Sequence, residues 1–108
     1  MKGDHLGEFE EFTLLAIRGV GDDTYAVPLQ QFIEEATGRA VSLGTVYSAL
    51  TRLEDKGYVR SSMSEAIAAR GGKPRRLYVV TPLGLRTMKD LHRVRLKMWR
   101  AITDRSRS

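Results

Sequence analysis

A capped helix between two glycines limits the folds open to this chain most strongly. It lies in the segment Gly38–Val59, GRAVSLGTVYSALTRLEDKGYV. Ser42 is a favoured N-cap residue, and Gly57 suits the left-handed conformation in which helices commonly end. The helix between them places three apolar residues at helical spacing, which predicts one buried stripe: Val46, Leu50 and Leu53. Its opposite side carries small polar residues and an arginine rather than the usual glutamates and lysines.

Two further helices are predicted before this one. Apolar spacing predicts the first over residues 7–20, and Gly19–Tyr25 is a turn rich in glycine and aspartate. The second is expected over Pro28–Thr37, with the proline in its first turn and Gly38 at its end. The expected apolar sides are Phe9, Phe12, Leu15, Ala16 and Gly19 in the first helix and Leu29, Phe32, Ile33 and Ala36 in the second.

A hairpin and a last helix are predicted behind the capped helix. Residues 58–63 and 76–81 are rich in β-forming residues, so they predict two strands. The loop between them is basic and contains two glycines. Thr81 can cap the last helix and Pro82 fits its first position, and the helix is expected to run to about Ile102. The final residues, DRSRS, are expected to form a frayed end.

This order of elements predicts a fold that is mainly α with a small β-hairpin. The second and third helices form a helix-turn-helix, and the hairpin behind them makes it a winged helix-turn-helix. The length of 108 residues predicts a single domain. Its winged-helix body is expected at about residues 7–81, and a C-terminal dimerisation helix at about residues 82–103.

Charge is distributed unevenly along the chain. Residues 1–38 carry a net charge of −6, residues 39–76 carry +5 and residues 77–108 carry +6. The basic two-thirds predicts binding to a polyanion, although basic residues can also simply solubilise exposed helix faces.

Short polar side chains on the capped helix predict contact with DNA. A helix fits the major groove of duplex DNA, and short side chains let its backbone approach the bases and phosphates. The wing, the hairpin loop with its flanking basic residues, suits the phosphate backbone or the minor groove. An ordinary amphipathic helix with a small outer face is the alternative. The expected DNA-binding residues are Ser42, Gly44, Thr45, Tyr47, Ser48 and Arg52 of the helix and Lys73, Arg75 and Arg76 of the wing.

Other function classes have little support in the composition. The chain has no cysteine and two histidines far apart in sequence, and no nucleophile, base and orienting group come together in a motif. We therefore expect no enzyme activity, metal site or cofactor. There is no secretory signal and no apolar run long enough to cross a bilayer, so the expected location is the cytoplasm.

The last helix carries a long apolar stripe that a small body cannot cover. Its far half is therefore expected to meet a second copy. Trp99 lies beside the stripe, either as dimer packing or as one wall of a pocket for a flat aromatic effector near Phe9 and Phe12. The acidic residues Asp4, Glu8, Glu10 and Glu11 would favour a cationic effector. The expected dimer residues are Leu85, Met88, Leu91, Val94, Met98 and Ile102.

The string as a whole resembles the PadR family of bacterial transcriptional regulators. LGEFEEFTLLAI (Leu6–Ile17) is similar to that family's first helix. GTVYSALTRLEDKGYV (Gly44–Val59) resembles the family signature G-T-[LV]-Y-x-x-L-x-R-L-E-x-x-G-[LY]-[VI] almost position for position. RGGKPRRLYVVTPLG (Arg70–Gly84) is similar to the wing and the strand-to-helix junction.

This resemblance covers roughly residues 6–90. It implies a dimeric winged helix that binds a palindromic operator on double-stranded DNA, usually as a repressor, and that joins its subunits through the C-terminal region. It also implies that Tyr47, its helix neighbours and the basic wing residues contact DNA, and some members release DNA on binding an aromatic compound. The alternative is a winged-helix protein–protein interaction module that does not bind DNA.

Overall fold

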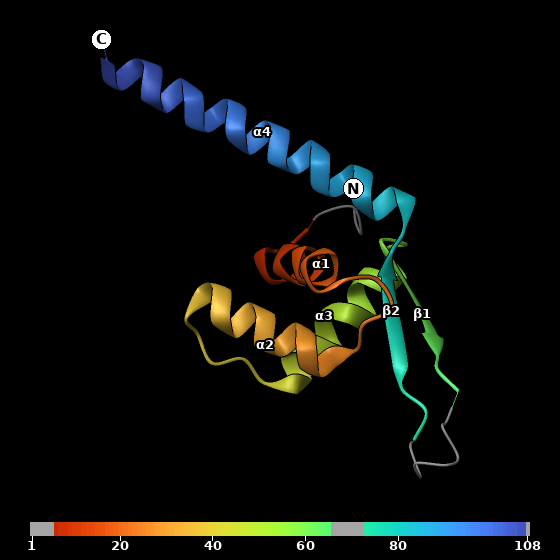
Figure 1. The fold of residues 1–108 in the computed structure, drawn as a ribbon. Helices are drawn as coiled ribbons and strands as arrows, with labels where there is room; N and C mark the ends of the chain where they lie inside the picture. Colours follow the sequence, from red (N-terminus) through yellow and green to blue (C-terminus); the bar gives the residue numbers. More distant parts are fainter. Residues whose placement is uncertain (1–5, 66–72, 108) are drawn as a thin grey trace.

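Four helices and one β-hairpin make up the protein (Figure 1). The structure, a computed structural model, describes residues 6–65 and 73–107. The order of elements confirms the predicted mainly α, winged helix-turn-helix fold. The elements are α1 (Glu8–Val20), α2 (Ala26–Thr37), α3 (Leu43–Asp55), β1 (Val59–Met63), β2 (Arg76–Val80) and α4 (Pro82–Arg107).

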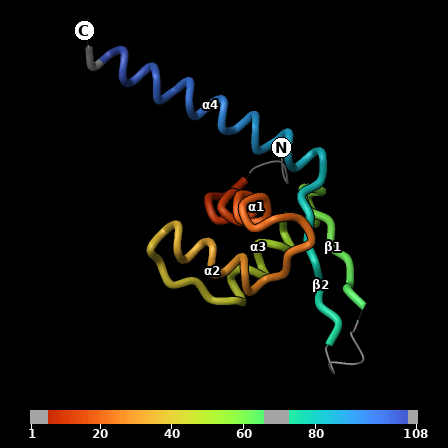
Figure 2. The backbone as a smooth tube through the Cα atoms, viewed as in Figure 1, coloured from red at the N-terminus to blue at the C-terminus, as the bar shows by residue number. Residues whose placement is uncertain are grey.

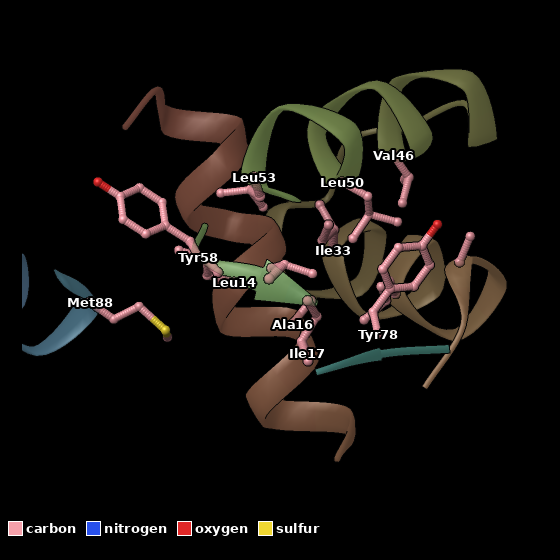
Figure 3. Close-up of a cluster of buried hydrophobic side chains, with 13 residues drawn as sticks. Leu14, Ala16, Ile17, Ile33, Val46, Leu50, Leu53, Tyr58, Tyr78 and Met88 are labelled. Carbon is pink, nitrogen blue, oxygen red and sulfur yellow. The ribbon is translucent and has the colours of Figure 1, made fainter. Parts of the chain in front are cut away.

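The core lies where α1, α2 and α3 meet the hairpin (Figure 3). All three residues of the predicted α3 stripe are buried in it. Tyr58 lies at one end of this cluster beside Met88 of α4, and Tyr78 lies at the opposite end (Figure 3). Removing this apolar surface from water is the main favourable contribution to folding. The core side chains include Leu14, Ile17, Leu29, Ile33, Val46, Leu50, Leu53, Tyr58, Tyr78 and Met88.

Helix ends follow the predicted capping residues. The Ser42 hydroxyl accepts a hydrogen bond from the Thr45 amide at 3.1 Å, which begins α3. Gly38 has φ of 70° after α2, and Gly57 has φ of 81° after α3, so both glycines adopt the conformation that favours them. The Thr81 hydroxyl accepts from the Gly84 amide at 3.0 Å and caps α4. These caps confirm the predicted helix starts at Ser42 and Thr81.

The predicted apolar side of α1 is only partly right, because Ala16 is fully buried but the other four predicted residues are not. Leu15 and Gly19 are exposed and Phe9 and Phe12 are only partly buried, whereas Leu14 and Ile17 are fully buried. The buried face of α1 also includes three polar residues, Glu10, Glu11 and Thr13. Ion pairs and hydrogen bonds satisfy their polar groups, so the spacing of hydrophobic residues alone does not identify this face.

Helix α2 also departs from the expectation. Leu29 and Ile33 are buried as predicted, but Phe32 and Ala36 are exposed. The helix begins at Ala26, two residues before the predicted start at Pro28. Pro28 is compatible with this start, because amides in the first turn of a helix lack helical partners.

Strands β1 and β2 pair antiparallel with Val59 opposite Val80. The turn before α2 adds a short third piece of strand that the sequence did not predict. Thr24 forms a bridge with Tyr78, whose amide donates to the Thr24 carbonyl at 2.8 Å. This bridge fixes the base of the wing to the start of the helix-turn-helix.

Helix α4 lies against α1 and then extends well beyond the body (Figure 2). Its start is tight, because Gly84 is buried against the backbone of Tyr58. The helix continues to Arg107 rather than ending near Ile102, so the expected frayed end is wrong up to that residue.

Candidate nucleic-acid interface

The N-terminal half of α3 presents a small, polar, exposed surface. Gly44, Thr45, Tyr47 and Ser48 are all exposed, and a Cβ added at Gly44 would meet nothing closer than the Ser42 hydroxyl at 3.8 Å. The backbone of this turn is therefore open to close approach by another molecule. Ser42 is partly committed to the fold, since its hydroxyl also lies 2.8 Å from that of Thr45.

Arg52 has a partner that the sequence analysis did not foresee. Its Nε donates to Glu10 Oε2 of α1 at 2.7 Å, while half of its side chain (50%) stays exposed. Its terminal guanidinium nitrogens can still face a ligand, so a DNA contact at Arg52 stays a prediction.

Glu10 holds α3 against α1. Its carboxylate is almost fully buried and also accepts from Lys56 Nζ at 2.7 Å and from the Gly7 amide at 3.1 Å. Burial raises the pKa of this carboxyl, but the hydrogen bonds from Lys56, Arg52 and Gly7 outweigh it, so the pKa lies below the ordinary value of 4.5. Glu10 therefore stays ionised and orients α3.

Wing residues Arg75 and Arg76 are exposed yet oriented by contacts. The Arg75 guanidinium lies 4.2 Å from the centroid of the Tyr25 ring, just before α2. Arg76 donates to the Ser61 hydroxyl at 3.0 Å, and that hydroxyl donates to Glu54 of α3 at 2.7 Å. Lys73 is exposed at the edge of the described residues. The glycines of the predicted tip, in residues 66–72, lie outside the described residues.

The polar surface of α3 and the basic wing are thus held in place by residues whose role the sequence did not predict. Tyr25 and Glu10 are the main additions. Their partners lie about forty residues or more away in sequence, so no local pattern could have identified them. The α3 surface and the wing are joined by Glu54 and Ser61.

The predicted dimer stripe of α4 divides into two parts. Met88 is buried against the body, and Leu85 and Leu91 are partly buried. Beyond them the apolar side chains are open to solvent in this single chain: Val94 is 48% exposed, Met98 62%, Ile102 58% and Trp99 68%.

The predicted effector residues do not meet within one chain. Phe12 lines an apolar hollow of about 440 Å³ between α1 and α2, together with Leu15, Phe32 and Ala36. Trp99 is not among the residues lining it, and Phe9 is partly buried beside the core.

Three of the four acidic residues expected to favour a cationic effector pair with basic residues of the same chain, and the preference itself stays a prediction. Glu8 pairs with Arg39 at 3.6 Å, and Glu10 pairs with Arg52 and Lys56. Glu11 pairs with Arg95 of α4. These carboxylates are neutralised inside the chain, and Asp4 lies outside the described residues.

The described ranges carry neither a metal-binding cluster nor a membrane-spanning helix. Residues 6–65 and 73–107 contain no group of three or more His, Cys, Asp or Glu side chains that could hold a metal ion. Within the same part of the chain, no helix is both long and apolar enough to span a membrane.

Comparison with known proteins gives a consistent result. The sequence model of the transcriptional regulator PadR-like family matches residues 14–90. The fold is similar to that of a PadR-like transcription factor from Bacteroides fragilis, with 25% identity, 89% of this chain and 87% of that chain covered, and a TM-score of 0.72. No curated protein sequence matches the chain.

Two further solved structures show the same fold. A PadR family transcription regulator from Clostridium difficile R20291 is 26% identical, with 91% and 93% of the two chains covered and a TM-score of 0.67. The winged-helix DNA-binding protein F93 from STIV is 18% identical, with 87% and 94% covered and a TM-score of 0.66.

Proposed function

The chain belongs to the PadR-like family of transcriptional regulators, and we propose that it is a repressor. It is thus a DNA-binding regulator of transcription rather than an enzyme. We propose that it acts as a homodimer on a palindromic operator, and that a small aromatic compound releases it. The observation that carries the proposal is the open, short-side-chain surface of α3 beside an oriented basic wing.

The proposed reading surface is the N-terminal half of α3. Gly44 and Ser48 allow close approach to base edges, and the Tyr47 hydroxyl is available to a phosphate. Thr45 lies at the edge of this surface, and Arg52 can extend its terminal nitrogens past Glu10. Selection of bound sequences from a random duplex pool tests this proposal, and we expect a two-fold symmetric consensus. Enrichment of no sequence would contradict operator recognition.

Replacing Lys73, Arg75 and Arg76 together by alanine should weaken binding to all duplexes similarly. Each lost phosphate contact lowers the log–log salt slope by about 0.9, so a reduction of up to about 2.7 is expected. Fluorescence anisotropy at salt concentrations from about 50 to about 200 mM measures the slope. Arg18→Ala is the control, since Arg18 pairs with Asp22 away from the wing. A triple variant with the original slope would remove these residues from the phosphate contacts.

The proposed dimer uses the far half of α4. Exposed Val94, Met98 and Ile102 continue the line of Met88 and Leu91, which cover the body, so a second copy can bury them. Two-fold symmetry would then set the two α3 helices on half-sites about 34 Å apart.

Light scattering should give twice the chain mass of 12.1 kDa for the original protein. Changing both Met98 and Ile102 to glutamate should give the monomer mass, because charges would be buried without partners. Lys97→Glu, on the other side of α4, should remain dimeric. A folded original protein that scatters as a monomer at micromolar concentration would exclude the dimer.

An aromatic effector is proposed to insert between Trp99 and the first helix, around Phe9 and Phe12. Such a ligand alters DNA affinity only if it binds the free and DNA-bound states unequally. Trp99 fluorescence is titrated with cationic and with anionic planar aromatic compounds. At least one compound should quench the fluorescence and lower DNA affinity in parallel. Quenching that leaves DNA affinity unchanged would leave Trp99 as dimer packing.

A further inference from the structure

Helix α4 carries positive charge that the proposed operator contacts do not use. Residues 77–108 have a net charge of +6, and all eight basic residues among them belong to α4. The helix packs on α1 and β2, whereas α2 and α3 lie on the other side of α1 (Figure 1). The positive charge of α4 therefore lies away from the reading helix.

Five of these cations line the outer side of α4 and are called here the outer stripe: Arg86, Lys89, Arg93, Lys97 and Arg100. At about 100° per residue they fall within a sector of about 80°. Met88 and Arg95, which contact the body, lie on the opposite side of the helix. All five side chains of the outer stripe are exposed.

The outer stripe is only partly neutralised. Asp90 pairs with Arg93 at 3.2 Å, and Asp104 lies on the same side of the helix. Five cations and two carboxylates leave this side with a net charge of +3. Four cations of the helical body each pair with a carboxylate within the described chain: Arg18, Arg39, Arg52 and Lys56.

Length and spacing of the outer stripe suit duplex DNA. From Arg86 to Arg100 the helix rises about 21 Å. Duplex DNA carries one phosphate charge per about 1.7 Å of its axis, so about twelve phosphates lie along that length. A straight row of long, flexible cations can neutralise such a backbone without reading its sequence. The proposed dimer contacts lie on another side of α4, so dimerisation leaves the outer stripe open.

We infer that the outer stripe is a second, sequence-independent binding surface for duplex DNA. One molecule then holds an operator on α3 and the wing and another DNA segment on α4. This inference rests on the proposed operator binding. A regulator already bound to its operator meets other segments of the same DNA at high effective concentration, so weak contacts suffice.

A capture experiment tests the inference. A short operator duplex, selected as above, is immobilised and saturated with protein, and a labelled non-operator duplex is added in about 0.1 M salt, where surface charges still interact over about 10 Å. The original protein should retain the labelled duplex. The variant with Arg86, Arg93, Lys97 and Arg100 all changed to glutamine should retain at least tenfold less, with unchanged dimer mass and operator affinity within about threefold.

Each result separates the outer stripe from the operator site. Operator binding without capture of the second duplex, or equal capture by the glutamine variant, would overturn the inference and leave the proposed function intact. Tighter binding of polyglutamate than of the duplex to the stripe would also overturn it, by indicating an acidic protein partner. If the protein selects no operator, the capture format cannot be used. Direct binding of a duplex to the variant with alanine at Lys73, Arg75 and Arg76 is then measured instead. Duplex binding by that variant should then fall at least tenfold on adding the four glutamines, and no further fall would overturn the inference.

Discussion

Gly84→Ala should lower the free energy of unfolding by about 3 kcal/mol, at the upper end of the cost of overpacking a core. A Cβ at this position would collide with the carbonyl oxygen of Tyr58 and lie 2.9 Å from Val80 Cγ1. The obstacle is backbone rather than the end of a flexible side chain, so α4 itself has to move. Its start, where Thr81 caps the helix and Met88 reaches the core, would shift with it.

Urea unfolding followed by circular dichroism measures this loss. Gly44→Ala is the matched control, because its Cβ would make only an ordinary contact with the Ser42 hydroxyl at 3.8 Å and alanine favours a helix over glycine by about 1 kcal/mol. The control should be as stable as the original protein or more so, yet should bind the operator more weakly if the backbone at Gly44 approaches DNA. Equal stability of the two alanine variants would contradict the close contact at Gly84.

Glu10→Gln should cost about 3 kcal/mol of stability, since removing the buried partner of an ion pair is strongly destabilising. Gln keeps the size of the side chain but not its charge, so Arg52 and the largely buried Lys56 lose their shared counter-ion. Glu8→Gln is the control: Glu8 is exposed and its contact with Arg39 is 3.6 Å long, so less than about 1 kcal/mol is expected.

The dependence of stability on pH gives an independent measurement of the Glu10 contribution. Above pH 4.5 the ionised carboxylate gives its full stabilisation, because the pKa of Glu10 in the folded protein lies below that value. As the pH falls from 4.5 through the lowered pKa, the folded protein takes up this proton and the contribution disappears. Stability of the original protein should therefore fall in this range more steeply than that of Glu10→Gln. Parallel curves would show that Glu10 is not the titrating group.

What the sequence could predict was local. Ser42, Gly38 and Gly57 determine helix ends through hydrogen bonds and backbone conformations within a few residues, so their roles are visible in the order of amino acids. The β-forming composition of the strands and the apolar stripe of α3 are equally local, and the winged fold follows from them.

What the sequence could not predict depends on contacts between distant residues. Glu10 and Glu11 look like solvated acids until α3 and α4 bring Arg52 and Arg95 to them. The contact of Arg75 with Tyr25 crosses the helix-turn-helix in the same way. The proposed DNA site could therefore be predicted from the types of its exposed residues. The residues that orient it could be identified only from the three-dimensional structure.

Adjacent carboxylates in the first turn of α1 make this turn unusually intolerant of insertions. Glu10 is bound to α3 and Glu11 to α4, so two separate helices are aligned by neighbouring positions of a third. One residue inserted between Glu10 and Glu11 would rotate one carboxylate by about 100° relative to the other. The two carboxylates would then no longer face α3 and α4 together, although the inserted residue adds only about 1.5 Å of helix. Length changes in natural or engineered variants are thus best accommodated elsewhere than in this turn.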